Sequence, residues 1–400
     1  MDLQPPDPAA ATSGLTAIRT CAFLAVLLSL LAGITSPALA TTESVVHSFG
    51  NPPDAYGPRC NLVADAAGNL YGTTFSGGVN NLGAVFVTTP AGAEHVLYSF
   101  TSGTDGTHPI AGLVYDKKTG NLYGTTVFGG TANSGTVFVV NATTGAESVL
   151  YSFKGGLDGA NPYSALVRSG TTIFGTTMNG GQFGYGTVFV LTAKGKETVL
   201  HSFNSAFPTL DGSYPYAGLV LYKGLLYGTT TLGGASNLGT VFSISKAGSY
   251  ALLYSFKGGT LDGQSPFGGV LFDKAGIIYG TTFGGGTDNA GVVYSLSGGA
   301  DVVLHSFLRN SADGINPYST LILFKKNFYG TATGGNSTGG TVFKVTPSGV
   351  ESTTHTFSGG ATDGFNPYGA LVVGADKKTL YGTTVIGGSS NLGTVFKVVP

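Results

Sequence analysis

The chain has 400 residues with 19 Lys and Arg against 20 Asp and Glu, so there is no basic excess of the kind that binds nucleic acid or anionic lipid. Charged residues make up only 10% of the chain and Gly contributes 66 residues, a composition typical of a turn-rich β protein. The 2 Cys cannot supply a disulfide framework, because Cys21 lies in an N-terminal segment that we expect to be removed.

The first 40 residues are predicted to be a secretory signal peptide. Arg19 precedes an apolar run of 14 residues, Cys21 to Ile34, and "SPALA" follows with small residues that favour cleavage after Ala40. The run is shorter than the about 20 residues that cross a bilayer. We therefore expect a secreted protein, extracellular or periplasmic, with no integral membrane segment after cleavage; an uncleaved anchor is the alternative.

One pentapeptide, LYGTT, recurs seven times with small changes, at intervals of 50 to 53 residues. Its aromatic residues are Tyr71, Tyr123, Phe174, Tyr227, Tyr279, Tyr329 and Tyr381. Three further blocks keep the same spacing: a [YH]-[ST]-F triplet, a D-G-x-x-P turn and a G-G-x-x-x-x-G-T-V-F segment. A fixed period of this length indicates a repeat architecture.

Turn residues divide each repeat into four short strands. In the second repeat these are "AGLVYD", "LYGTT", "GTVFVV" and "ESVLYSF", all rich in β-branched and aromatic residues. No stretch of the mature chain has the period of an amphipathic helix. Residues 41–400 are therefore predicted to form a single all-β domain, a seven-bladed β-propeller of about 52-residue four-stranded repeats.

The two ends of the repeat region complement each other. "ESVVHSF", Glu43 to Phe49, matches the fourth strand of the other repeats, whereas the last repeat stops at "GTVFKVVP" and lacks that strand. We expect the N-terminal strand to pair with Thr394–Val399 in the last blade and close the ring, which leaves no free sheet edge. We also expect a monomer.

Residues present in every repeat are expected to serve the scaffold. The aromatic ring of LYGTT is predicted to fill the space between blades, and the Gly after it to permit a close backbone approach. The recurring Asp is predicted to form a turn by accepting backbone N–H groups, and Cys60 to be a small buried residue. No cofactor or metal is predicted. A hydrogen-bonding role is expected at one position that is either His or Tyr: His47, Tyr98, Tyr151, His201, Tyr254, His305 and His355.

Candidate binding residues directly follow the recurring proline, at the start of each innermost strand. Arranged around the mouth of the axial channel, they would offer flat apolar faces and hydroxyl groups to a sugar ring or a peptide. The alternative is that they only seal neighbouring blades together. These residues are Arg59, Ile110, Tyr163, Tyr216, Phe267, Tyr318 and Tyr368. His108, in the second D-G-x-x-P loop, is a further candidate because no other repeat has His there.

The repeats resemble the GloVer tandem-repeat family over about residues 43–400, through the motifs "LYSF-x-GG-x-DG-x-x-P-x-AGLV", "GNLYGTT" and "GG-x-x-x-x-GTVF". The resemblance implies a secreted bacterial propeller-like protein with no established biochemical activity.

Our first functional hypothesis is a non-catalytic propeller that binds a glycan or another extracellular polymer through its loop-rich face. A passive cell-surface scaffold with a protein partner is the main alternative. A polysaccharide-degrading enzyme is the third, and it is disfavoured because carboxylates outside the repeated turns are sparse and Arg59, Arg168 and Arg309 are not expected to meet.

Overall fold

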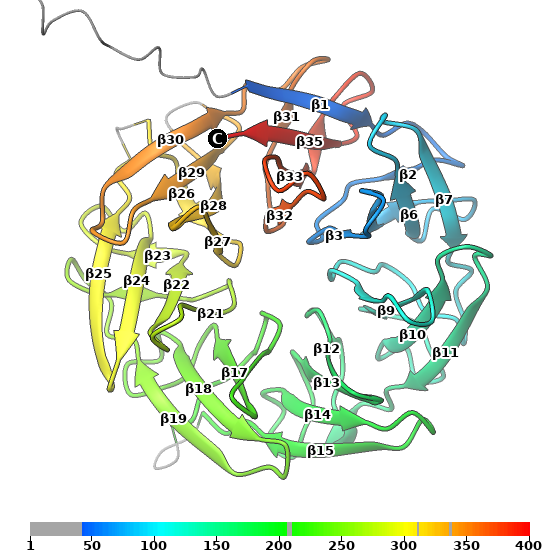
Figure 1. Ribbon diagram of the computed structural model, residues 1–400. Coiled ribbons are helices and arrows are strands. Elements are labelled where there is room, and N and C mark those ends of the chain that lie inside the picture. Colours follow the sequence, from blue (N-terminus) through cyan, green and yellow to red (C-terminus); the bar gives the residue numbers. More distant parts are fainter. Residues whose placement is uncertain (1–41, 206–209, 310–311, 336–337) are drawn as a thin grey trace, which may run out of the picture. The chain divides into compact units, whose positions relative to one another are not determined.

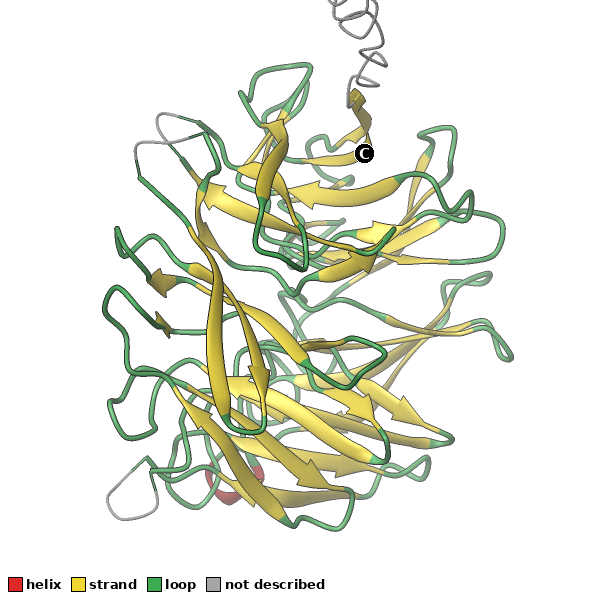
Figure 2. Ribbon diagram, turned by 60° about the vertical axis from the view of Figure 1, so that its left-hand side comes forward, coloured by secondary structure: helices red, strands yellow, loops and turns green. Residues whose placement is uncertain are grey.

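The short runs of β-branched and aromatic residues form antiparallel strands, and Gly, Asn and Asp residues end them. The computed structural model describes residues 42–400 except 206–209, 310–311 and 336–337, so the predicted signal peptide lies outside the described residues. Within these ranges the only helical segment is one 3-10 turn, η1 (Gly156–Asp158), drawn in red in Figure 2. The all-β fold class is confirmed.

Seven four-stranded antiparallel sheets surround a central axis, as the predicted seven-bladed propeller requires (Figure 1). From axis to rim, blades 1 to 3 contain β3 (Val63–Ala64), β4 (Leu70–Thr74), β6 (Ala84–Thr88) and β7 (Glu94–Ser99); β8 (Val114–Asp116), β9 (Asn121–Thr126), β10 (Thr136–Asn141) and β11 (Glu147–Ser152); β12 (Val167–Ser169), β13 (Thr172–Thr177), β14 (Thr187–Leu191) and β15 (Glu197–Ser202). Blades 4 to 6 contain β16 (Val220–Tyr222), β17 (Leu225–Thr230), β18 (Thr240–Ser245) and β19 (Tyr250–Ser255); β21 (Leu271–Phe272), β22 (Ile278–Thr282), β24 (Val292–Ser297) and β25 (Ala300–Ser306); β27 (Ile322–Phe324), β28 (Asn327–Gly334), β29 (Thr341–Val345) and β30 (Glu351–Thr356). Blade 7 contains β32 (Val372–Val373), β33 (Leu380–Thr384), β35 (Thr394–Val399) and β1 (Thr42–Ser48).

The N-terminal strand closes the ring, as predicted. β1 pairs antiparallel with β35, with Glu43 opposite Val398 and Ser48 opposite Thr394. The first and last described strands are therefore neighbours in one sheet, and Figure 1 shows β1 on the outer side of β35.

Each connection between blades pairs with the loop that follows the second strand of the next blade. Four connections do so through short strands: β2 (Ala55–Tyr56) with β5 (Ser76–Gly77), β20 (Gly263–Gln264) with β23 (Gly284–Gly285), β31 (Gly364–Phe365) with β34 (Ile386–Gly387), and β26 (Ile315–Pro317) with β28. The other three use single bridges: Thr107 with Phe128, Ala160 with Asn179, and Ser213 with Leu232. The D-G-x-x-P and glycine-rich loops thus lie together on one face, which is the loop-rich face of the propeller.

The innermost strands are shorter than predicted, with only two or three residues each. The residues before them lie where neighbouring blades meet at the axis, and in blades 5 and 7 an N–H group of these residues bonds to a side chain of the next blade. Ala370 donates its N–H to Oδ1 of Asn61 at 2.6 Å, and Gly269 donates to Oγ1 of Thr320 at 2.8 Å. Small residues are required here because a side chain on Gly369 would collide with the carbonyl group of Cys60.

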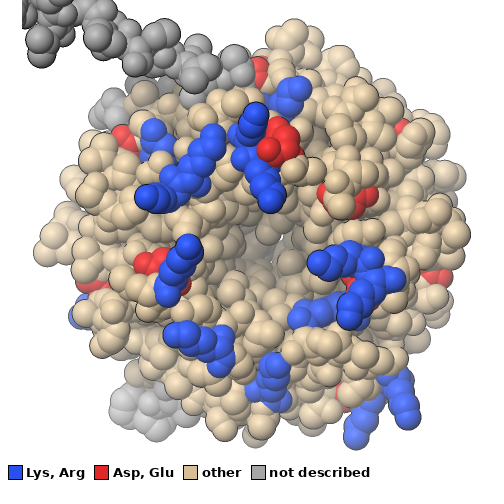
Figure 3. All heavy atoms as spheres, viewed as in Figure 1, with Lys and Arg blue, Asp and Glu red and all other residues tan. Residues whose placement is uncertain are grey.

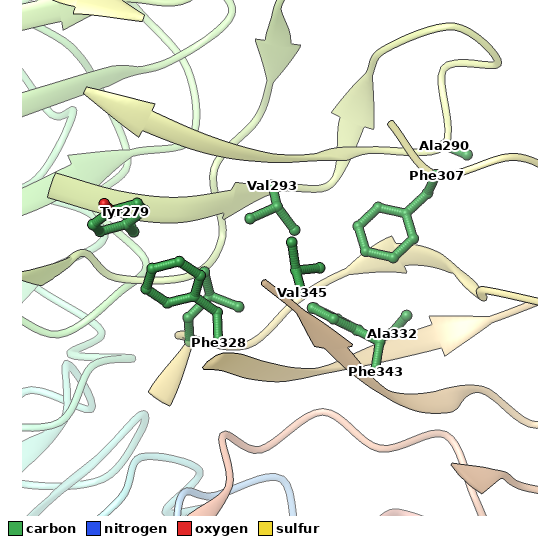
Figure 4. Packing of buried hydrophobic residues seen from close by; sticks show 9 residues of the cluster. Tyr279, Ala290, Val293, Phe307, Phe328, Ala332, Phe343 and Val345 are labelled. Atoms are coloured by element: carbon green, nitrogen blue, oxygen red, sulfur yellow. The ribbon is translucent and has the colours of Figure 1, made fainter. Parts of the chain in front are cut away.

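Blades pack through a repeated pair of rings, one from the outer strand of each blade and one from the third strand of the next. Phe307 and Phe343 form such an edge-to-face pair at 5.0 Å, and Figure 4 shows them with Val293 and Val345 between blades 5 and 6. Equivalent pairs at 4.9 to 5.2 Å occur at the six other junctions: Phe49–Phe86, Phe100–Phe138, Phe153–Phe189, Phe203–Phe242, Phe256–Tyr294 and Phe357–Phe396. Edge-to-face geometry adds to the gain from burying both rings.

The residues of LYGTT have three separate structural roles. The aromatic ring packs toward the next blade, as predicted: Tyr71 stacks on Tyr115 at 5.6 Å. The Gly was predicted to permit a close approach of another backbone segment, and this was wrong, because an aromatic ring approaches it instead. A Cβ on Gly124 would collide with Phe138 on the adjacent strand. The first Thr bonds across the blade junction, and Thr383 closes the ring by donating to the carbonyl oxygen of Cys60 at 3.1 Å.

Candidate functional site

The chain segments that follow the recurring prolines line one cavity on the axis of the ring. Its volume is about 350 Å³, and all seven residues directly after the prolines lie in its wall. They are Arg59, Ile110, Tyr163, Tyr216, Phe267, Tyr318 and Tyr368. Residues about 50 positions apart in the sequence are thereby brought together, one from each repeat. We refer to this cavity as the axial pocket.

The five aromatic rings of the axial pocket contact one another. The ring centroid of Tyr216 lies 5.2 Å from that of Tyr163, 5.3 Å from Phe267 and 5.5 Å from Tyr318. Tyr318 in turn stacks on Phe267 at 4.7 Å and meets Tyr368 edge-on at 5.0 Å. Because every ring of this cluster remains partly exposed, it joins the blades and also presents apolar faces to the pocket.

The polar groups of the axial pocket come from the same residues. Burial raises the pKa of the Tyr216 and Tyr318 hydroxyl groups, which hydrogen-bond to each other and stay neutral. Arg59 is exposed, with its guanidinium carbon 5.8 Å from the Tyr368 ring and 5.1 Å from the Phe75 ring. A cation beside several aromatic faces can hold a ring-shaped polar or acidic group.

Two further lining residues, Asn61 and Thr320, were missed by the sequence analysis. Both stand at a position that is Gly or Ala in the other five repeats. This departure from the repeat pattern is the signal that would have identified them. Each accepts a backbone N–H from the neighbouring blade, so their side chains are fixed in the wall of the axial pocket.

His108 does not line the axial pocket. Its ring packs against Phe75 at 4.6 Å and Phe128 at 5.9 Å, and burial lowers its pKa. His108 has a left-handed backbone with φ of 58°, the conformation that Asn161 adopts at the same position of the next repeat. The unique residue type therefore occupies a turn position that every repeat shares, outside the cavity.

A second group of polar residues lies at the outer junctions between blades. The outermost strands of the blades follow one another around the rim (Figure 1). The first residues of each outermost strand therefore lie close to the end of the outermost strand of the preceding blade. The recurring Asp accepts backbone N–H groups in six of the described connections, as predicted; Asp363 accepts those of Ser358 and Gly364, both at 2.7 Å. At six of the seven junctions this Asp also hydrogen-bonds to the Tyr or His of the triplet, as Asp105 does to the Tyr98 hydroxyl group at 3.0 Å; at the remaining junction Nε2 of His47 has no partner.

An additional carboxylate, which starts the next outer strand, completes six of these junctions. Burial raises the pKa of each, with a neighbouring Asp adding to the effect in every case. The resulting pKa values are about 7 for Glu43, Glu147, Asp301 and Glu351 and about 8 for Glu94 and Glu197. At the remaining junction Tyr250 takes this place and stacks on His201 at 4.3 Å. The junctions were not predicted as sites, since each combines three distant parts of the sequence.

The three arginines of the described chain do not converge. Arg168 pairs with Asp116 at 2.8 Å, Arg309 donates to the carbonyl oxygens of Asp288 and Asn289, and Arg59 lies in the axial pocket. These three residues therefore form no common site, as the sequence predicted.

The charged residues are distributed unevenly over the surface. Figure 3 shows Lys and Arg side chains around a central hollow on the face seen in Figure 1. Lysines recur in the turns between the first and second strands of the blades: Lys117, Lys118, Lys223, Lys274, Lys325, Lys326, Lys377 and Lys378. These hairpins thus carry a large share of the positive charge.

No helix among the described residues has the length and apolar character needed to cross a membrane.

Comparison with solved structures finds the same fold in proteins of low sequence identity. The extracellular domain of a hybrid two-component system from B. thetaiotaomicron is 12% identical, with a TM-score of 0.57 over 90% of this chain and 42% of that one. An oligogalacturonate lyase in complex with manganese is 10% identical, with a TM-score of 0.55 over 90% of both chains. An oligogalacturonate lyase from Vibrio parahaemolyticus is 10% identical, with a TM-score of 0.51 over 91% of this chain and 94% of that one.

These likenesses establish the propeller fold and nothing about activity, since propellers support many functions. No curated protein sequence matches the chain. The model of the Gloeobacter/Verrucomicrobia repeat matches three times, over residues 34–157, 63–270 and 239–400. Together these matches span the whole ring of blades, and the chain belongs to the Gloeobacter/Verrucomicrobia repeat family.

Proposed function

We propose that this propeller binds a glycan or another extracellular polymer at the axial pocket and does not catalyse a reaction there. The observation that carries the proposal is the convergence of five partly exposed aromatic rings and Arg59 on one cavity of about 350 Å³. Aromatic faces with a few fixed polar groups are the usual composition of a site that holds a sugar ring.

The composition of the axial pocket supports binding without catalysis. Among the described residues that line it there is no Asp, Glu or His, the usual general acids and bases of glycan cleavage. The hydroxyl groups of Tyr216 and Tyr318 remain neutral, since burial raises the pKa of both. The lining can therefore position a ligand but offers few groups that move a proton.

The test is binding of polysaccharides and glycan arrays by the parent protein and by Tyr163→Ala. Tyr163 lies at one end of the aromatic cluster, where its ring contacts Tyr216 alone among the pocket rings, so its removal should leave the fold intact. We expect affinity to fall about tenfold, because one stacked ring contributes about 1–2 kcal/mol. The matched control is Tyr222→Ala, which removes a ring stacked on Phe272 at 4.0 Å outside the pocket.

The outcome that contradicts the proposal is unchanged affinity in Tyr163→Ala and in Arg59→Ala. Binding that is lost at high salt and unaffected by both variants would instead point to the lysines of the hairpin turns. Failure to bind any polymer would favour the protein-interaction scaffold, and release of reducing sugar would require an enzyme.

We further propose that the protein acts outside the cytoplasm, with residues 1–40 as its signal peptide and residues 41–400 as the mature domain. The extracellular location of one propeller of the same fold supports this. The N-terminal sequence of the exported protein tests it: Thr41 is expected as the first residue, and an intact N-terminus would contradict cleavage.

A further inference from the structure

Three of the outer junctions bring together one His and two carboxylates. The three groups are His47, Asp54 and Glu94; His305, Asp313 and Glu351; and Glu43, His355 and Asp363. In each group one nitrogen or oxygen atom from every residue lies within 4.8 Å of the others. We call these the histidine junctions.

Two of the histidine junctions contain buried side-chain atoms without hydrogen-bond partners. The Glu43 side chain is only 8% exposed, and its Oε1 is buried without a partner. Nε2 of His47 and Oε1 of Glu94 are likewise buried and unpartnered. Glu147, Glu197 and Asp301 at the other junctions also have an unpartnered carboxylate oxygen. The histidine junctions differ from them in the imidazole nitrogen beside the two carboxylates, and a bound cation can satisfy the lone pairs of all three groups.

The separations within the histidine junctions suit a small divalent ion. Nε2 of His305 lies 3.0 Å from Oδ2 of Asp313, and Nε2 of His355 lies 3.2 Å from Oδ1 of Asp363 and 3.9 Å from Oε2 of Glu43. Since Zn²⁺ binds nitrogen and oxygen ligands at about 2.0–2.2 Å, two ligands of one ion lie about 3–4 Å apart.

The surrounding chain already holds the ligand groups in place. Asp54 accepts the N–H groups of Gly50 at 2.6 Å and of Ala55 at 2.7 Å, and Asp363 is fixed in the same way. Hydrogen bonds that orient a carboxylate are the usual support of a metal ligand. A surface pocket of about 580 Å³ lined by Asp54 and Glu94 gives an ion access to the first of the histidine junctions.

We propose that each histidine junction binds one divalent transition-metal ion, for which Zn²⁺ is the probe, between two neighbouring blades. One imidazole nitrogen and two carboxylate oxygens match the ligand preferences of Zn²⁺, whereas Ca²⁺ requires six to eight oxygen ligands. The bound ion links the outer strand of one blade to the outer strand of the next, in addition to the hydrogen-bonding role that the sequence predicts for these histidines.

The other junctions of the same ring supply the controls. Tyr98, Tyr151 and Tyr254 stand at the histidine position in three repeats, so Tyr is compatible with the fold there. The fourth histidine, His201, pairs with Asp211 at 2.8 Å, but Tyr250 replaces the second carboxylate. That junction is not expected to bind the ion.

The experiment titrates ZnCl₂ into the EDTA-treated, dialysed full chain and measures heat of binding and thermal unfolding. We expect about three sites per chain and an unfolding temperature that rises with Zn²⁺ and not with Ca²⁺. The triple variant H47Y/H305Y/H355Y should lose all three sites, whereas the control H201Y should keep them. If the triple variant folds poorly, E43Q/E94Q/E351Q keeps the side-chain shapes and should lose the sites equally. Absence of saturable Zn²⁺ binding in the parent, or binding unchanged in both triple variants, would overturn the proposal.

Discussion

Tyr294 stands where the six other repeats have Phe, and its hydroxyl group is buried without a hydrogen-bond partner. The ring of Tyr294 keeps the edge-to-face contact with Phe256 at 5.2 Å, so it differs from the equivalent Phe of the other repeats only by its hydroxyl oxygen. We expect Tyr294→Phe to raise the free energy of unfolding by about 1–2 kcal/mol, because an unsatisfied buried hydroxyl is removed and no contact is lost. Urea unfolding measures the change. The reciprocal variant Phe343→Tyr should destabilise by a similar amount, and equal stability of Tyr294→Phe and the parent would contradict this reasoning.

At the scale of single residues, the sequence identified the residues that line the axial pocket but not the surroundings of His108. The position after each proline was predictable because the repeat fixes one direction for all seven side chains, and residues of the axial pocket such as Tyr163 and Tyr318 follow it. His108 was chosen as a candidate for its residue type alone, which does not say where its side chain points, and the structure places it outside the axial pocket. The mutual contacts of the rings depend on the width of the axis, which no single repeat encodes.

Among elements, the outer junctions were the least predictable feature. Asp105 lies in a connection and Glu147 starts the outer strand of the next blade, and only the twist of the sheets brings them together. The order of strands and blades, by contrast, followed from the fixed repeat period and the turn residues. The inner strands were predicted too long, and in two of them an N–H group before the strand, that of Gly269 or Ala370, bonds to the neighbouring blade. Strand periodicity does not reveal such a partner.

The three outer junctions that have Tyr98, Tyr151 or Tyr254 in place of a histidine make the stability of the protein depend on pH. Burial and a neighbouring Asp raise the pKa of Glu147 to about 7, of Glu197 to about 8 and of Asp301 to about 7. The folded state therefore holds these protons more tightly than the unfolded chain. The resulting stabilisation is complete below about pH 4 and is lost as the pH rises through 7 to 8.

Thermal unfolding in EDTA at pH 5 and pH 9 tests this dependence. We expect a loss on the order of 1 kcal/mol per junction at the higher pH, allowing for solvent screening. The variant E147Q/E197Q/D301N, whose amides stay neutral, should show a shallower dependence than the parent. An equally steep loss in parent and variant would place the titrating groups elsewhere.

For the whole molecule, the N-terminal strand joins the two ends of the ring. The four strands of every other blade come from consecutive parts of the chain, whereas blade 7 combines the first described strand with the last. Residues 42–49 supply β1 and Phe49, which packs edge-on against Phe86 of blade 1 at 5.0 Å. They therefore fill the outer position of blade 7 and also seal the junction between the last blade and the first. The sequence made this arrangement predictable, because the missing fourth strand at one end matches the extra strand at the other.

A chain that begins at residue 50 should lose much of its stability, since the outer edge of β35 becomes free and Phe86 loses its partner. We expect the free energy of unfolding to fall by at least about 3 kcal/mol, the usual cost of deleting one buried Phe side chain, and the truncated chain to aggregate on heating. Attaching residues 42–49 after Pro400 through a turn like those of the other blades should restore the parent's unfolding temperature, because the strand then has the chain order that six blades already use. Scanning calorimetry of the three proteins compares them directly. A truncated chain as stable as the parent would show that the ring does not need its N-terminal strand, whereas failure of the permuted chain alone would show that the strand must enter from the N-terminal side.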